Sequence, residues 1–194
     1  MTTTLEESAR LAGSHAWLER RLFEITGGWV TTTAEPEAKL MLDRHSHHHS
    51  WRAEQWVERL PVLADVDRAA LAATADPDLA PALAALERAS DTPARLAGLY
   101  RFALPRLWGA YHRHLSAVGG AAVGGAAVGG AAVGGAAGGI ADGSTLRTLG
   151  IVIPDVTSDW QEGEALLQNL LVSREAVAQA VSTVGDLEAA RIRA

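Results

Sequence analysis

The chain has 194 residues, a net charge of −6 and a pI near 5.6, and 48% of its residues are hydrophobic. This composition is typical of a single globular domain over residues 1–194, and the negative charge argues against nucleic acid and membranes as partners. Because the chain has no cysteine, disulfides and thiolate metal sites are excluded. The first residues, MTTTLEESARLAG, lack the apolar core of a secretion signal, so a cytoplasmic protein is expected.

Two long helices are predicted in the first sixty residues. Between residues 5 and 25 apolar side chains recur at steps of three and four, which indicates an amphipathic helix, and Gly27-Gly28 is expected to end it. Pro36 is typical of a first helical position, and no helix-breaking residue follows until Pro61. A second helix is therefore predicted over residues 36–60.

Shorter helices are predicted in the middle of the chain. An Ala- and Leu-rich stretch is interrupted by Asp76-Pro77, which predicts two separate pieces over residues 66–75 and 77–89. A longer helix is predicted over residues 93–115. It is expected to bend at Pro105, because proline has no N–H to donate and its ring clashes with the preceding turn.

The C-terminal part is less regular. The stretch LRTLGIVI, at residues 146–153, fits helix and strand equally well, and Pro154 is expected to end it. Ser158, with Gln161 three residues later, has the pattern of a capping box and predicts a last helix over residues 158–184. Several helical segments without a hairpin pattern predict an all-α protein.

Low-complexity sequence separates these two parts of the chain. Between residues 117 and 139 the pentad AVGGA occurs four times and then degrades, and this run contains ten glycines. Each glycine costs a helix about 1 kcal/mol relative to alanine, and a period of five matches neither helix nor strand. So many glycines also exclude a membrane span. We expect a disordered Gly/Ala-rich loop, with an elastin-like or interaction segment as the alternative.

Four of the seven histidines lie in the stretch HSHHHSWRAEQW, residues 45–56. On a helix this stretch has two faces, one with His45, His48, His49 and Arg52 and the other with His47, Trp51 and Glu54. Spacings of three and four allow two imidazoles to reach one metal ion. A polar lining inside a bundle and a solvated face are the other interpretations. Trp51 and Trp56, which follow the histidines, favour burial of this stretch. We expect His45 and His48 to point inward and His47 or His49 to be more exposed.

Acids on other helices are candidate partners for these histidines. Glu24 lies near the C-terminal end of the first helix, where a carboxylate is unfavourable to the helix dipole and needs a partner. Glu164 shares a helical face with Leu167 and is expected to point inward. Carboxylates and imidazoles that face one another across a bundle can bind a metal, and Tyr111 or His112 is expected nearby. Structural ion pairs with arginines, or hydrogen bonds, are the alternative for each of these residues.

The stretches LFEITGGWV, EPEAKLMLDRHSHHHSWRAEQWVERLPVL and DWQEGEALLQNLL resemble a group of actinobacterial ferritin-like proteins. The resemblance implies a ferritin-like antiparallel four-helix bundle with one or two extra short helices. It also implies a site at the bundle midpoint, which in the wider superfamily often holds two irons or manganeses. The chain has no Glu-x-x-His, the usual ligand pair of that superfamily, so the implied shell is a reduced one formed by Glu24, His45, His48, Glu54 and Glu164.

Two kinds of function follow from these expectations. The first is an Fe or Mn centre of oxidoreductase or oxygen-handling type, in which Glu24 and Glu164 bridge or bind the metal and His45 or His48 completes the shell. The alternative is a metal-free bundle that binds a small molecule or a protein partner, or that forms a homodimer through a Trp-rich face. No motif for nucleophilic catalysis or phosphate binding is present, and enzyme activity is left open.

Overall fold

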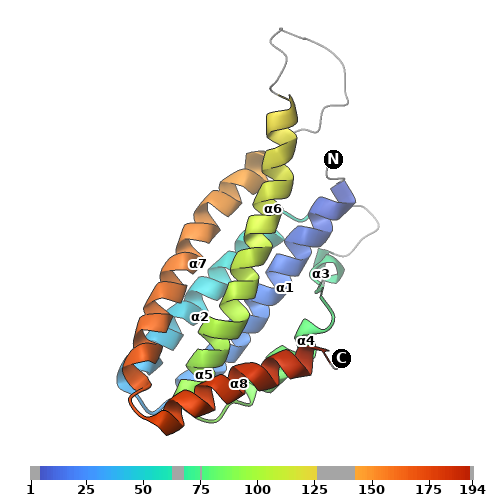
Figure 1. Cartoon of the computed structure of the whole chain (residues 1–194). Helices are drawn as coiled ribbons and strands as arrows, with labels where there is room; N and C mark the ends of the chain where they lie inside the picture. Colours follow the sequence, from blue (N-terminus) through green and yellow to red (C-terminus); the bar gives the residue numbers. More distant parts are fainter. Residues whose placement is uncertain (1–4, 63–67, 75, 126–142, 193–194) are drawn as a thin grey trace.

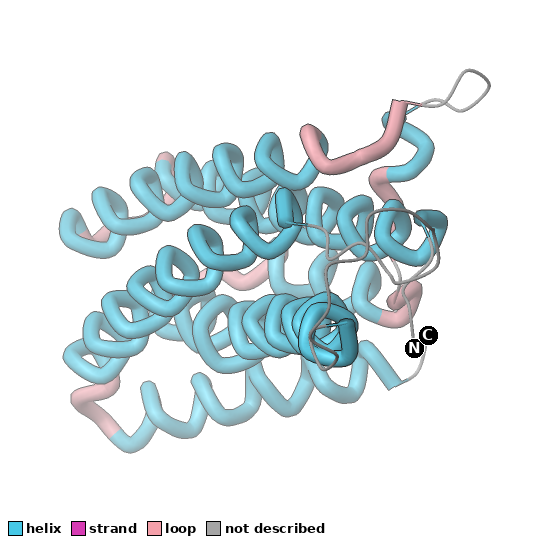
Figure 2. The backbone as a smooth tube through the Cα atoms, turned by 90° about the horizontal axis from the view of Figure 1, so that it is seen from above, coloured by secondary structure: helices cyan, strands magenta, loops and turns pink. Residues whose placement is uncertain are grey.

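The computed structural model of the chain describes residues 5–62, 68–74, 76–125 and 143–192, and these residues form helices joined by loops. Four helices are long and lie side by side (Figure 1): α1 (Leu5–Val30), α2 (Pro36–Val57), α6 (Leu104–Gly125) and α7 (Gly143–Leu170). Figure 2 shows no strand in any of the described ranges. The prediction of an all-α protein is therefore confirmed.

The long helices form a bundle in which α1 contacts α2 and α6, and α7 contacts the same two helices. Neighbouring helices run in opposite directions (Figure 1). Between α2 and α6 the chain returns along the bundle through α3 (Arg68–Leu71), α4 (Leu79–Glu87) and α5 (Thr92–Ala97). The last helix, α8 (Arg174–Ile192), packs across one end of the bundle against α4 and α5.

Helix α1 continues through Gly27-Gly28, so the predicted end of this helix is wrong. A Cβ added at Gly27 would lie 2.9 Å from the Ser46 hydroxyl oxygen, which means that the glycine permits close approach of α2. The extra turn is also anchored, because the buried Trp29 indole donates to the Glu87 carbonyl at 3.1 Å. Packing here outweighs the helix-breaking tendency of two glycines.

The predicted helix over residues 93–115 is present, and its irregularity is a π-helical turn. Asp91 caps α5 by accepting a hydrogen bond from the Ala94 N–H at 2.9 Å. The π-helical segment η1 (Gly98–Ala103) follows and passes directly into α6, whose second residue is Pro105. Since proline cannot donate the usual helical hydrogen bond, the wide turn accommodates it.

Helix α6 extends into the AVGGA repeat, so residues 117–125 are helical rather than part of a disordered loop. The buried Leu107 and Tyr111 fix the preceding turns against the bundle, and an existing helix gains one hydrogen bond for each residue added. The remainder of the predicted loop, residues 126–139, lies outside the described residues.

Helix α7 is continuous through residues 146–170, although the sequence predicts two separate elements there. LRTLGIVI is helical, Pro154 lies inside the helix, and Ser158 is an interior position rather than a cap. The buried Val152 precedes Pro154 and the buried Val156 follows it, and their packing compensates the hydrogen bond that proline loses.

The C-terminal helix also begins and ends elsewhere than predicted. A break at residues 171–173 separates α7 from α8, so the single predicted helix over 158–184 is wrong. Ser173 caps α8, because its hydroxyl oxygen accepts from the Ala176 N–H at 3.1 Å. None of the helices in the described ranges has the length and apolar character that crossing a membrane requires.

Candidate metal centre

Charged side chains from three helices meet in the interior of the bundle. Glu19 of α1 and Arg52 of α2 are both 0% exposed, and Asp159 of α7 is 3% exposed. Helix α2 contributes one stripe at spacings of three and four, formed by His45, His48, His49 and Arg52. Helix α7 contributes a matching stripe formed by Asp155, Asp159 and Glu162.

Arg52 is the cation at the centre of this network. Its Nε donates to Glu19 Oε1 at 2.8 Å, while Nη1 donates to Asp155 Oδ2 at 2.5 Å and to Asp159 Oδ2 at 2.8 Å. Tyr111 also donates to Glu19, from its hydroxyl to Oε1 at 2.5 Å. Burial alone lowers the pKa of Arg52, but Glu19 and Asp159 outweigh it and raise that pKa. The guanidinium is therefore permanently charged.

The two buried carboxylates of the network, Glu19 and Asp159, are held in their charged form. Burial alone raises the pKa of Glu19, but Arg52 and His49 reverse the shift and leave the pKa below its ordinary value. The pKa of Asp159 is likewise lowered, because His45 and Arg52 outweigh the effect of burial.

Burial disfavours the charged form of two histidines of the network. Burial is the largest influence on His45 and His49, and the pKa of each is lowered despite the neighbouring carboxylates. Two buried carboxylates, from Glu19 and Asp159, and the partly exposed carboxylate of Asp155 share the guanidinium of Arg52, which leaves a formal excess of negative charge. Excess charge in a bundle interior is costly unless a cation pairs with it.

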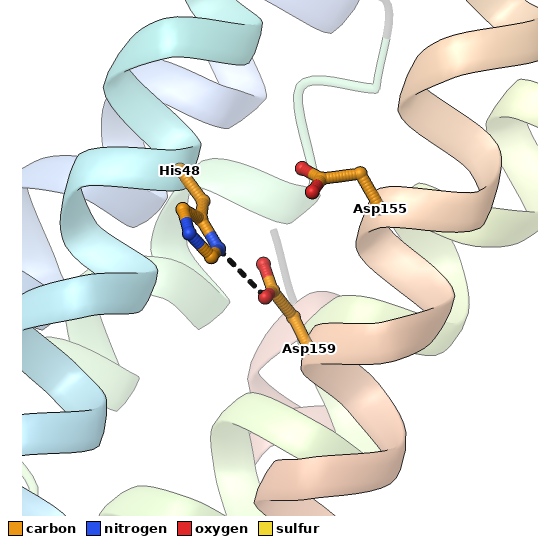
Figure 3. Close-up of side chains that lie close together, drawn as sticks. All are labelled: His48, Asp155 and Asp159. Carbon is orange, nitrogen blue, oxygen red and sulfur yellow. Dashed lines mark hydrogen bonds and ion pairs between the residues drawn. The ribbon is translucent and has the colours of Figure 1, made fainter.

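One group of side chains has the spacing of a metal site (Figure 3). Among the described residues, ligand atoms of His48, Asp155 and Asp159 all lie within 4.8 Å of one another. His48 Nδ1 is 2.8 Å from Asp159 Oδ1. His45 approaches the same carboxylate, since its Nε2 is 3.5 Å from Asp159 Oδ1 and 3.2 Å from Glu162 Oε2.

The residues predicted as ligands are distributed over several parts of the bundle. His45 and His48 lie at the group just described. Glu24 is exposed and pairs with Arg21 on the same helix, and Glu54 is exposed on α2. Glu164 pairs with Arg101, whose Nη2 is 2.6 Å from its Oε1. The structure brings together the two histidines but not the three glutamates, and metal binding by any of the five stays a prediction.

The faces predicted for the histidine stretch are largely confirmed. His45 is buried and His47 is exposed, while the side chain of His48 is half-buried at 36% exposure. His49 is buried against Glu19, with 2.5 Å between His49 Nδ1 and Glu19 Oε2. Of His47 and His49, the exposed residue is therefore His47. The solvated-face interpretation therefore does not apply to His45 and His49.

Sequence reasoning missed Glu19, Asp155 and Asp159. Asp155 and Asp159 were overlooked because Pro154 was read as the end of an element, which hid their spacing of four on one continuous helix. Glu19 lies four residues after the buried His15 and three before the buried Leu22, so the periodicity of α1 places it inward. The signal for Glu19 is therefore an acid in phase with the apolar positions of its helix.

Comparisons with protein-family models, with curated proteins and with solved structures give no match to this chain. No family is identified by them. The resemblance to ferritin-like proteins depends on the quoted sequence stretches alone.

The buried histidines predict how stability depends on pH. His15, His45 and His49 have a lowered pKa in the folded chain, first because of burial, so the unfolded chain binds more protons below pH 6.5. Their contribution to stability is complete above that pH and is lost as the pH falls. We expect the free energy of unfolding in urea to decrease between about pH 7.5 and about pH 5.5.

Two substitutions on α2 sharpen this test. His49→Gln should flatten the pH dependence of the free energy of unfolding, because it removes a buried titrating group. His47→Gln is the control, since His47 is exposed on the same helix, and it should leave the dependence unchanged. A free energy of unfolding that is constant over this pH interval in the parent chain would contradict the account.

Proposed function

We propose that this helical bundle binds one divalent metal ion at His48, Asp155 and Asp159. The observation that carries the proposal is the convergence of three ligand atoms within 4.8 Å beside an interior with excess negative charge. A divalent cation at this point would neutralise that excess. His48 is half-buried and Asp155 is 33% exposed, so the group is accessible from solvent.

The ligand types favour Mn²⁺ or Fe²⁺. Carboxylate oxygens suit Mn²⁺, and imidazole nitrogen suits iron and zinc. A set of two carboxylates and one imidazole therefore fits Mn²⁺ or Fe²⁺. Arg52 donates to one oxygen of each aspartate, so the guanidinium and a bound ion would share these two carboxylates. Metal binding through His48 Nδ1 replaces a proton there, so affinity should increase with pH.

We further propose that the bundle is ferritin-like, with an oxidoreductase or oxygen-handling role. Antiparallel neighbours and one long connection between α2 and α6 support this assignment. Two features favour one ion over the pair common in that superfamily: the sequence contains no Glu-x-x-His, and Arg52 occupies the space between the inner carboxylates. The π-helical turn beside the site also supports a functional role, because Tyr100 on it lies 2.7 Å from His45.

The test is Mn²⁺ binding followed by electron paramagnetic resonance, in which the signal of free Mn²⁺ decreases as the ion binds. The untagged parent chain should bind one equivalent, and Asp159→Asn and His48→Gln should each weaken binding by about 10-fold or more. His47→Gln is the matched control and should bind like the parent. Absence of Mn²⁺ and Fe²⁺ binding by the parent, or equal affinity in all four chains, would leave the metal-free interpretation.

A further inference from the structure

A cavity separate from the metal group lies between α1, α6 and the segments around α4 and α8. Its volume is about 710 Å³, within the range of small-molecule sites. Apolar side chains line part of it, including Leu11, Leu18 and Leu79. The cavity is large enough for an organic molecule with an apolar body.

The polar lining of this cavity is mostly cationic. It contains three arginines, Arg106, Arg113 and Arg191, and one acid, Asp76, in a chain whose net charge is −6. Such a local reversal of charge favours an anionic ligand.

The three arginines differ in whether they already have an acidic partner. Arg106 pairs with Glu188, and Arg191 Nη2 lies 2.9 Å from Asp76 Oδ2. Within the described ranges no carboxylate pairs with Arg113. Arg113 lies along its own helix, because its Nη1 is 3.3 Å from the position that a Cβ on Gly109 would occupy. Its guanidinium is therefore free to pair with an incoming anion.

Two buried histidines form the inner end of the cavity. His15 and His114 are 3% and 1% exposed, and His15 Nε2 lies 3.1 Å from His114 Nδ1. Burial, His114 and the charge of Arg113 hold the pKa of His15 well below its ordinary value. The positive charge of Arg113 therefore acts at the inner end of the cavity, beside His15.

We propose that this cavity binds an organic acid with one anionic group and an apolar body. Arg113 pairs with the carboxylate, and the leucines contact the apolar part. This proposal does not depend on the metal site, because none of its residues belongs to the group of His48, Asp155 and Asp159.

The experiment is isothermal titration calorimetry with octanoate and with octanamide, which has the same chain without the charge. The parent chain should bind octanoate about 10-fold more tightly than octanamide, because a charge-assisted pair with Arg113 distinguishes them. Arg113→Gln should remove this preference. Arg147→Gln is the control, since Arg147 is exposed on α7 and does not line the cavity.

A second variant tests the cavity itself. Ala110→Trp places an indole in the cavity and should weaken binding of both probes by about 10-fold or more. Its far-UV circular dichroism and melting temperature should stay close to those of the parent, because Ala110 is only partly buried. Absence of octanoate binding, equal affinity for both probes, or unchanged binding in Arg113→Gln or Ala110→Trp would overturn the proposal.

Discussion

Arg52→Met is expected to lower the free energy of unfolding of the metal-free chain by about 3–5 kcal/mol. The substitution keeps most of the side-chain volume but removes the guanidinium that pairs with Glu19, Asp155 and Asp159. Glu19 is fully buried and cannot move its charge to solvent, so an unpaired carboxylate would remain inside. Urea denaturation with excess chelator measures this loss.

Arg44→Met on the same helix is the matched control. Arg44 pairs with Glu162, and both side chains are about half exposed, so this pair contributes at most about 1 kcal/mol. A similar loss of stability in Arg44→Met and Arg52→Met would contradict the assignment of the interior network as the dominant charge interaction.

The same Arg52→Met variant should bind Mn²⁺ more tightly than the parent chain. Arg52 Nη1 and a metal ion compete for the carboxylates of Asp155 and Asp159, so removing the guanidinium leaves more negative charge for the ion. Arg52→Met should therefore lower the stability of the metal-free chain and raise its affinity for Mn²⁺. Weaker Mn²⁺ binding in Arg52→Met would show that the guanidinium supports the site rather than competing for it.

Gly163→Ala is expected to destabilise the bundle by about 3 kcal/mol, the upper part of the usual range for overpacking. A Cβ at this position would lie 2.1–2.3 Å from three ring atoms of Tyr100. Tyr100 is fully buried, and its hydroxyl lies 2.7 Å from His45 Nδ1, so the ring cannot withdraw without losing this contact.

Gly150→Ala on the same helix is the control for the substitution itself. A Cβ at Gly150 meets no atom within 4 Å, so alanine should increase helix stability by up to about 1 kcal/mol. Thermal unfolding followed by circular dichroism should therefore shift in opposite directions for the two variants. Equal shifts would contradict the close contact between α7 and Tyr100.

Helical periodicity was sufficient to predict the all-α fold and the inward side of α2. A single helix carries its own phase, so the buried His45 and the exposed His47 follow from their spacing. Periodicity did not predict the inward side of α7, which the sequence divides into two elements. On α7 the buried position is Gly163, and Glu164 is one residue further round the helix, where it pairs with Arg101.

The partners across the bundle were beyond the reach of sequence periodicity. Spacing within α2 cannot indicate which residue of α1 or α7 lies opposite, because that depends on how the helices are offset along the bundle. Glu24 was chosen for its unfavourable place near a helix end, yet the inward acid of α1 is Glu19, which bonds to His49 and Arg52. The π-helical turn that positions Tyr100 also has no pattern of its own beyond the nearby Pro105.

The most direct test of the metal centre is an anomalous difference map from crystals of the untagged chain soaked in Mn²⁺. The account predicts one peak between α2 and α7, within about 2.5 Å of His48 Nδ1 and of one oxygen each from Asp155 and Asp159. The peak should be absent from crystals of Asp159→Asn and present in crystals of His47→Gln. A map of the parent chain without a peak at this group, or with its strongest peak at the exposed His47, would contradict the account.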